Sequence, residues 1–213
     1  MLPVERGCRA QGSSALNEAF AASGPQDVRF LVERHPLAWV QSCTDAGDVQ
    51  ASLLPLVGDY DAQGRLIALI GHFARHNPLH DALRGDARAN ILFTGPQGYV
   101  SPEHAGLRDW APTWNYVQMR IAADLQFDDA LTGPALDMLI GDMERVRPVP
   151  WRKEELGARY HRLAGAIIGF RAEVRSCTAI FKLGQDERPE VLSHILSTHP
   201  DAVLVEWMRR FNR

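Results

Sequence analysis

The residues best suited to chemistry gather in two short stretches. In the first, residues 71–78 (Gly-His-Phe-Ala-Arg-His-Asn-Pro), an apolar strand ends and enters a turn, and the stretch carries His72, Arg75 and Asn77. Phosphates are held by fixed cationic and N–H donors, and Arg supplies a planar fork that Lys lacks. We therefore expect an anion-binding edge here. The alternative is a strand end whose His and Asn hydrogen-bond the turn, and spacing alone favours that alternative.

The second stretch, residues 110–116 (Trp-Ala-Pro-Thr-Trp-Asn-Tyr), places three aromatic rings and an amide around a proline. Trp114 and Tyr116 offer flat apolar faces to a planar ring, and Asn115 carries a donor and an acceptor that could read the ring's polar edge. The alternative is a tight aromatic corner that seals the end of a barrel, because aromatic clusters are mostly core.

Other chemical motifs are missing from the sequence. His72, His76 and His80 have the spacing of helical metal ligands, but the first belongs to an expected strand and no carboxylate-histidine signature surrounds them, so we predict no metal site. The three cysteines form no CxxC pair, which also argues against zinc and fits a reducing cytoplasm. Without a Walker loop, a GxSxG elbow or an HExxH helix, no catalytic residue is predicted.

Hydrophobic periodicity predicts many short strands and peripheral helices. The clearest strand is 116–127, where apolar side chains alternate with polar ones, so one face is core and the other is wet. Further strands are expected at 38–44, 51–57, 65–73, 88–94, 166–175 and 177–183, the last two as a hairpin. Residues 95–102 are expected to form a turn, a short strand and a second turn. Helices are expected after Pro25, from Thr132 to Val146, at 152–164, and twice in 187–213, divided near His199.

Short strands with few parallel crossovers favour an antiparallel β-barrel with flanking helices, an α+β fold, over a doubly wound sheet. We expect a loosely ordered arm at 1–25, a barrel domain at 26–186 and a helical extension at 187–213. No apolar run approaches the roughly 20 residues needed to cross a bilayer. The protein is therefore expected in the cytoplasm, without membrane contact.

The motifs resemble those of the PaiB-like family of FMN-binding negative transcriptional regulators, which are split β-barrels. The resemblance rests on residues 71–78, 95–102 (Gly-Pro-Gln-Gly-Tyr-Val-Ser-Pro), the Trp-Asn-Tyr corner and 181–186 (Phe-Lys-Leu-Gly-Gln-Asp). It implies an FMN pocket formed at or near seven residues: His72, Arg75, Asn77, Trp114, Asn115, Tyr116 and Lys182. It also implies a homodimer with flavin sites at the subunit interface.

Three departures from the family pattern weaken the expectation of FMN binding. Leu53 stands where the family tends to have a histidine, while Gly184 and Asp186 replace a serine and an asparagine. The first two changes remove a polar side chain. Asp186 adds a negative charge, which would oppose a phosphate that faced the same pocket.

The resemblance implies a regulator, more a sensor of flavin or redox state than an enzyme. Two alternatives stay open. One is an FMN-dependent oxidoreductase of a small molecule, in which the cofactor would carry the chemistry. The other is a split barrel that has lost FMN and acts as an interaction module.

The charge of the chain limits how it could meet DNA. A net charge of -3 and a pI near 6.2 give no overall attraction to phosphate backbones, so contact with DNA would need a local basic surface or a second subunit. Arg209, Arg210 and Arg213 are one candidate. They equally complement the C-terminal dipole of a helix, and this second interpretation is favoured.

Overall fold

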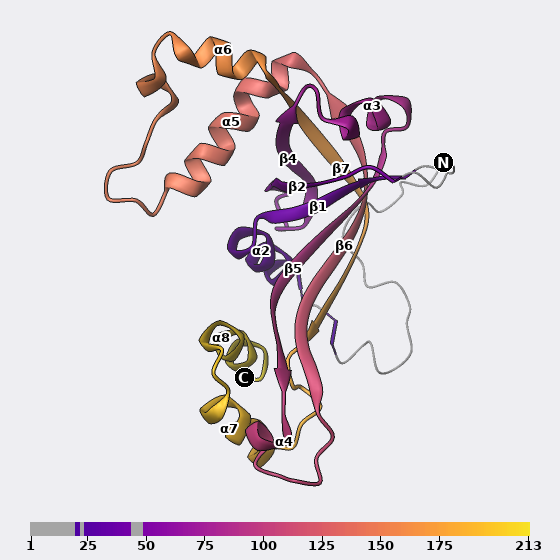
Figure 1. Cartoon of the computed structure of the whole chain (residues 1–213), viewed down its shortest axis with the longest axis vertical. Helices are drawn as coiled ribbons and strands as arrows, with labels where there is room; N and C mark the ends of the chain where they lie inside the picture. The colour runs from indigo at the N-terminus through magenta and orange to yellow at the C-terminus, as the bar shows by residue number, and fades with distance from the viewer. Residues whose placement is uncertain (1–19, 22–23, 44–48) are drawn as a thin grey trace. The chain divides into compact units, whose positions relative to one another are not determined.

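A computed structural model of the chain describes residues 20–21, 24–43 and 49–213. Its strands form one seven-stranded sheet in the order β2-β1-β5-β6-β7-β4-β3 (Figure 1). They are β1 (Leu37–Ser42), β2 (Ala51–Pro55), β3 (Val57–Tyr60), β4 (Leu66–Ala74), β5 (Arg88–Val100), β6 (Thr113–Phe127) and β7 (Ile167–Lys182). The helices are α2 (Pro25–Arg34), α3 (Pro78–Gly85), α4 (Pro102–Ala105), α5 (Asp129–Glu144), η1 (Lys153–Leu156), α6 (Arg159–Gly165), α7 (Pro189–Thr198) and α8 (Ala202–Phe211).

The chain divides into two compact units. The described residues of unit 1 are 24–43, 49–93 and 120–177, and those of unit 2 are 20–21, 94–119 and 178–213. The long strands β5, β6 and β7 contribute residues to both units. Most of the arm expected at 1–25 lies outside the described residues.

The sheet curls back on itself within unit 1. β1 pairs with β2 and β5, and β4 pairs with β3 and β7, all antiparallel. β2 and β4 lie towards opposite ends of the strand order, yet they contact each other. Asn77, just after β4, donates a hydrogen bond of 2.9 Å to the hydroxyl of Ser52 on β2. This closure confirms the expected antiparallel, α+β split barrel.

Alternating apolar side chains build the core of unit 1, because successive residues of a strand point to opposite faces of the sheet. The rings of Phe73 and Phe170 lie 5.3 Å apart at its centre, and both side chains are almost fully buried. Each large apolar side chain buried in this way stabilises the fold by about 1.5–3 kcal/mol. Other buried members are Leu66, Ala68, Leu69, Ile91, Phe93, Ile121, Ala123, Leu125, Ala172 and Val174.

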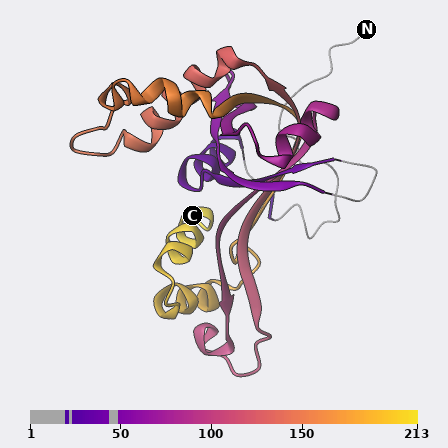
Figure 2. The same cartoon turned by 45° about the horizontal axis from the view of Figure 1, so that its top comes forward.

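Unit 2 has its own apolar centre, which the C-terminal helices provide. α7 contacts both α4 and α8, as Figures 1 and 2 show. On α8, Trp207 and Phe211 stack with Phe181 of β7 at centroid distances of 6.3 and 4.8 Å. Asp201 caps the helix through its carboxylate, which accepts from the backbone N–H groups of Val203 and Leu204. The two helices predicted in 187–213 are thus confirmed.

Two of the expected strand ends are wrong. The hairpin expected between 166–175 and 177–183 is one continuous strand, β7, and β5 continues through the turn expected at Gly95 as far as Val100. In both strands the buried side changes parity, between Val174 and Cys177 and between Phe93 and Pro96. A one-residue shift interrupts the alternation of apolar and polar residues without ending the strand. In the sequence this interruption looks the same as a turn between two strands.

None of the helices among the described residues is long and apolar enough to span a membrane.

Gly169 on β7 should be essential for the packing of α5 in unit 1. An added Cβ at this position would lie 2.7 Å from the backbone of Leu131 and Thr132, and the Gly169 N–H donates to the Thr132 hydroxyl at 3.0 Å. Gly169→Ala is therefore expected to lower the free energy of unfolding by about 1–3 kcal/mol in urea titrations. Gly141→Ala on α5, where a Cβ meets nothing within 4 Å, is the control and should stabilise the helix by up to about 1 kcal/mol. Equal stability of the two variants would contradict the packing described.

Candidate functional site

The residues singled out by the sequence fall into two groups, one in each unit. His72, Arg75 and Asn77 belong to unit 1. The other four belong to unit 2, namely Trp114, Asn115, Tyr116 and Lys182.

Asn77 has a structural role at the end of β4. Its side-chain oxygen accepts from the N–H of Leu79 at 3.0 Å and so caps α3, which begins with Pro78. Its amide nitrogen donates to the Ser52 hydroxyl. Both ends of the amide are thus engaged in the turn, and a role for Asn77 in flavin binding stays a prediction.

Arg75 lies at the base of the chain segment between β6 and β7. Its guanidinium forms an ion pair with Asp129, the first residue of α5, and donates to the carbonyl of Gly165, the last residue of α6, at 3.0 Å. Its backbone N–H also donates to the carbonyl of Ala166 at 3.0 Å. Arg75 therefore holds the start and the end of this segment together, and whether it also contacts a phosphate stays a prediction.

His72 differs from its neighbours because its side chain lacks a partner. The Nδ1 atom is buried and forms no hydrogen bond with any described residue. Burial lowers the pKa of His72 below its usual 6.5, because an imidazolium would lose its hydration there. The imidazole is neutral near pH 7 and offers a hydrogen-bonding nitrogen that the surrounding protein does not use.

Trp114 and Tyr116 line a pocket of about 390 Å³ in unit 2. Trp114 is 53 % exposed, and the ring of Tyr99 approaches it edge-on at a centroid distance of 6.0 Å. Both pocket aromatics lie on one face of β6 because they are two residues apart. The rest of the lining comes from Thr94, Gly95, Gln97, Val117 and Gln118.

Three polar residues of this pocket were not among the predicted site residues. Thr94, Gln97 and Gln118 line it, and the described part of the chain provides their side chains with no hydrogen-bond partner. Gln118 could have been found from the sequence, because it shares the wet face of the predicted strand with Tyr116. The pocket thus combines flat apolar rings with free amide and hydroxyl groups and no charged side chain.

Asn115 and Lys182 are engaged inside unit 2. Asn115 is 2 % exposed and lies on the other face of β6, where its amide nitrogen is 3.6 Å from the sulfur of Met208. Lys182 donates to the hydroxyl of Thr113 and, at 3.0 Å, to the carbonyl of Trp114. Lys182 therefore supports the strand that carries the pocket aromatics. A direct role for either residue in flavin binding stays a prediction.

The departures from the family pattern have local explanations. Gly184 has a left-handed backbone (φ +88°), which favours glycine, and a Cβ added there would lie 3.2 Å from Leu192 and 3.3 Å from Met208. Asp186 is exposed. Leu53 is 48 % exposed and pairs across the strands with Trp39 in unit 1.

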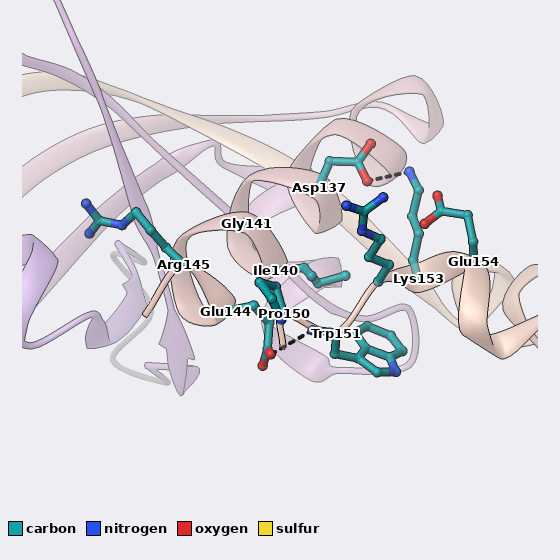
Figure 3. Close-up of a pocket in the computed structure, with 10 residues that line it drawn as sticks. Asp137, Ile140, Gly141, Glu144, Arg145, Pro150, Trp151, Lys153 and Glu154 are labelled. Carbon is teal, nitrogen blue, oxygen red and sulfur yellow. Dashed lines mark hydrogen bonds and ion pairs between the residues drawn. The ribbon is translucent and has the colours of Figure 1, made fainter. Parts of the chain in front are cut away.

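A second pocket, of about 330 Å³, lies in unit 1 between α5 and η1 (Figure 3). Its walls include Ile140, Pro150 and Trp151, and none of the predicted site residues lines it. No group of three or more His, Cys, Asp or Glu side chains is placed to hold a metal ion in the described part of the chain.

The partly buried imidazole of His72 should make stability depend on pH. Because its pKa is lowered by folding, the unfolded chain binds more protons below pH 6.5, and stability present above that pH is lost as the pH falls towards the folded pKa. His72→Gln, which cannot titrate, should flatten this loss in urea titrations at pH 7.5 and 5.5, as reported by intrinsic fluorescence. Parallel pH dependences for the two proteins would show that His72 is hydrated.

Comparisons with known proteins agree with this fold. A protein from Mycobacterium smegmatis, described as an FAD and heme binding protein, superimposes with a TM-score of 0.59 at 18% identity, covering 81% of this chain and 78% of its own. A conserved hypothetical protein from Mycobacterium tuberculosis gives a TM-score of 0.55 at 11% identity, covering 80% and 92%. At such identities the likeness shows the fold alone. No curated protein matches the sequence.

The sequence itself matches one family model, whose description is "Putative FMN-binding domain", over residues 15–176. The match spans most of the 213 residues, including residues 72–77 at the end of β4, both pocket aromatics and the segment between β6 and β7. The chain therefore belongs to this family of FMN-binding domains.

Proposed function

We propose that this protein binds FMN and, as a PaiB-like homodimer, acts as a negative transcriptional regulator that senses flavin or redox state. The observation that carries FMN binding is the pocket of unit 2, in which Trp114 and Tyr116 face free polar groups. Membership of the FMN-binding family supports the cofactor. The regulatory role rests on the resemblance of residues 71–78 and 95–102 to PaiB-like proteins.

The composition of the pocket suits the ring system of a flavin. Its volume of about 390 Å³ lies within the range of small-molecule sites. Trp114 and Tyr116 would bind the apolar part of the ring, and the amides of Gln97 and Gln118 would orient its polar edge. Because the lining holds no cation, this pocket suits the ring and not the phosphate. Bound FMN would supply the capacity to accept and release electrons.

Loss of Trp114 should weaken FMN binding with little effect on folding, because the side chain is half exposed. Aromatic contacts of this kind contribute about 0.5–1.5 kcal/mol, so Trp114→Ala is expected to raise the Kd by about two- to twelvefold. The measurement is quenching of flavin fluorescence during titration of ligand-stripped protein. Trp39→Ala, which removes a tryptophan of similar exposure from β1, is the matched control and should leave the Kd unchanged.

The same titration tests the other predicted residues. His72→Ala should weaken binding if its free Nδ1 serves the cofactor. An unchanged Kd would remove His72 from the site, and absence of saturable binding by the unmodified protein would refute FMN as the ligand. Turnover of NADH or NADPH with an acceptor, without binding to duplex DNA, would favour the oxidoreductase over the regulator.

A further inference from the structure

The structure describes every residue of the segment between β6 and β7 in unit 1, yet most of this segment contributes no buried side chain. Residues 129–166 form α5, η1 and α6, and their buried members, Thr132, Ala135 and Leu139, all lie in the first part of α5. From residue 140 to 166 no side chain is buried. In both views the connection from α5 to α6 extends away from the strands of unit 1 (Figures 1 and 2).

Polar contacts hold this exposed segment in a defined shape. Lys153 forms an ion pair with Asp137, which raises the pKa of Lys153, and its ammonium lies 5.7 Å from the centre of the Tyr160 ring. The backbone N–H of Trp151 donates to the Glu144 carboxylate at 3.0 Å. Figure 3 shows both contacts, one on each side of the pocket between α5 and η1. Polar contacts, and not buried apolar side chains, therefore give this segment its shape.

Residues 145–162, called the basic platform below, carry a marked excess of positive charge. They include six Arg or Lys side chains and two Glu, and two of the six cations, Arg145 and Lys153, form ion pairs with Asp142 and Asp137 of α5. The guanidinium groups of Arg147, Arg159 and Arg162 have no hydrogen bond or ion pair with any described residue. Arg159 and Arg162 share one face of α6 because they are three residues apart. Such a surface attracts an array of anions.

We propose that the basic platform binds the phosphate backbone of duplex DNA, an inference that rests on the proposed regulatory function. Free guanidinium groups pair with phosphate oxygens and release condensed counterions, which gives binding without sequence preference. Val149, which is 86 % exposed, lies between Arg147 and Arg152 in the sequence.

The arginines of α8 fit this role less well. Arg209 donates to the carbonyl of Leu196 at 3.1 Å and so ties α8 to α7, and Arg210 also has a partner. Using Arg209 on DNA would compete with its contact to Leu196, whereas the guanidinium groups of Arg147, Arg159 and Arg162 have no partner among the described residues. The local basic surface that a chain of negative net charge needs is therefore placed at 145–162.

The test compares two triple variants of the full chain by fluorescence anisotropy of a labelled, mixed-sequence duplex at several salt concentrations. The platform variant is Arg147→Gln, Arg159→Gln, Arg162→Gln. The control variant is Arg84→Gln, Arg108→Gln, Arg120→Gln, which removes three other exposed, unpaired guanidinium groups and causes the same change in net charge. The slope of log K against log salt should shrink by about one unit per platform arginine and stay near its original value in the control.

Each outcome has a separate meaning. Equal losses in the two variants would show that only net charge matters and would overturn the platform, while leaving a DNA-binding regulator intact. No duplex binding by the unmodified protein would overturn the platform and the regulatory role together, and tighter binding to the single strand would overturn duplex DNA as the partner. FMN titrations of all three proteins report on the cofactor independently, and their thermal unfolding checks that the variants fold.

Discussion

The two-residue alternation of the long strands is the constraint on which both the core and the pocket depend. On β6 it places Asn115 and Val117 in the interior and leaves Trp114 and Tyr116 on the other face. A shift of one residue would exchange these sets, exposing apolar side chains and burying the aromatic pair. The register is held within unit 2 by Lys182, whose ammonium binds the backbone of Trp114. The same alternation of side chains along β6 thus produces both the buried core and the pocket.

The alternation also changes phase at two points, and both coincide with the division of the chain into units. The buried side of β5 shifts after Phe93, and that of β7 shifts before Cys177. The unit boundaries fall directly after Phe93 and directly after Cys177, so both shifts lie within a few residues of a boundary. The long strands β5 and β7 thus redirect their buried side chains near the boundary between the units, whereas β6 keeps a single alternation through both.

Much of the fold could be predicted from the sequence because it rests on local periodicity. α2, the helices of 187–213 and the strand at 116–127 were all visible as apolar stripes or alternation. The single strands β5 and β7 were not, since a parity shift and a turn produce the same break in the pattern. Asn115 shows a second limit. Its amide chemistry led to the prediction of ligand contact, which stays untested, and the alternation of β6 places its side chain on the buried face, opposite Trp114 and Tyr116.

The candidate site was harder to predict than the fold because the partners of polar groups are set by distant segments. Nothing near Asn77 in the sequence indicates that Ser52 receives its amide hydrogen, 25 residues away. Likewise, the unused nitrogen of His72 depends on the burial that surrounding strands impose. The residue types show which hydrogen bonds and charges each side chain can offer. Only the tertiary structure shows which of these groups already have partners within the protein.

The double attachment of Arg75 has a consequence for any anion that binds at the end of β4. Its guanidinium already holds Asp129 at the start of α5 and the carbonyl of Gly165 at the end of α6. An incoming phosphate would compete with the Asp129 carboxylate for the same donors, so part of its binding free energy would be spent on replacing that contact. By reciprocity, any change that strengthens the attachment of the segment to Arg75 would weaken binding of the anion, and binding of the anion would weaken that attachment. A single side chain would then couple occupancy of the strand end to the attachment of the residues that follow β6.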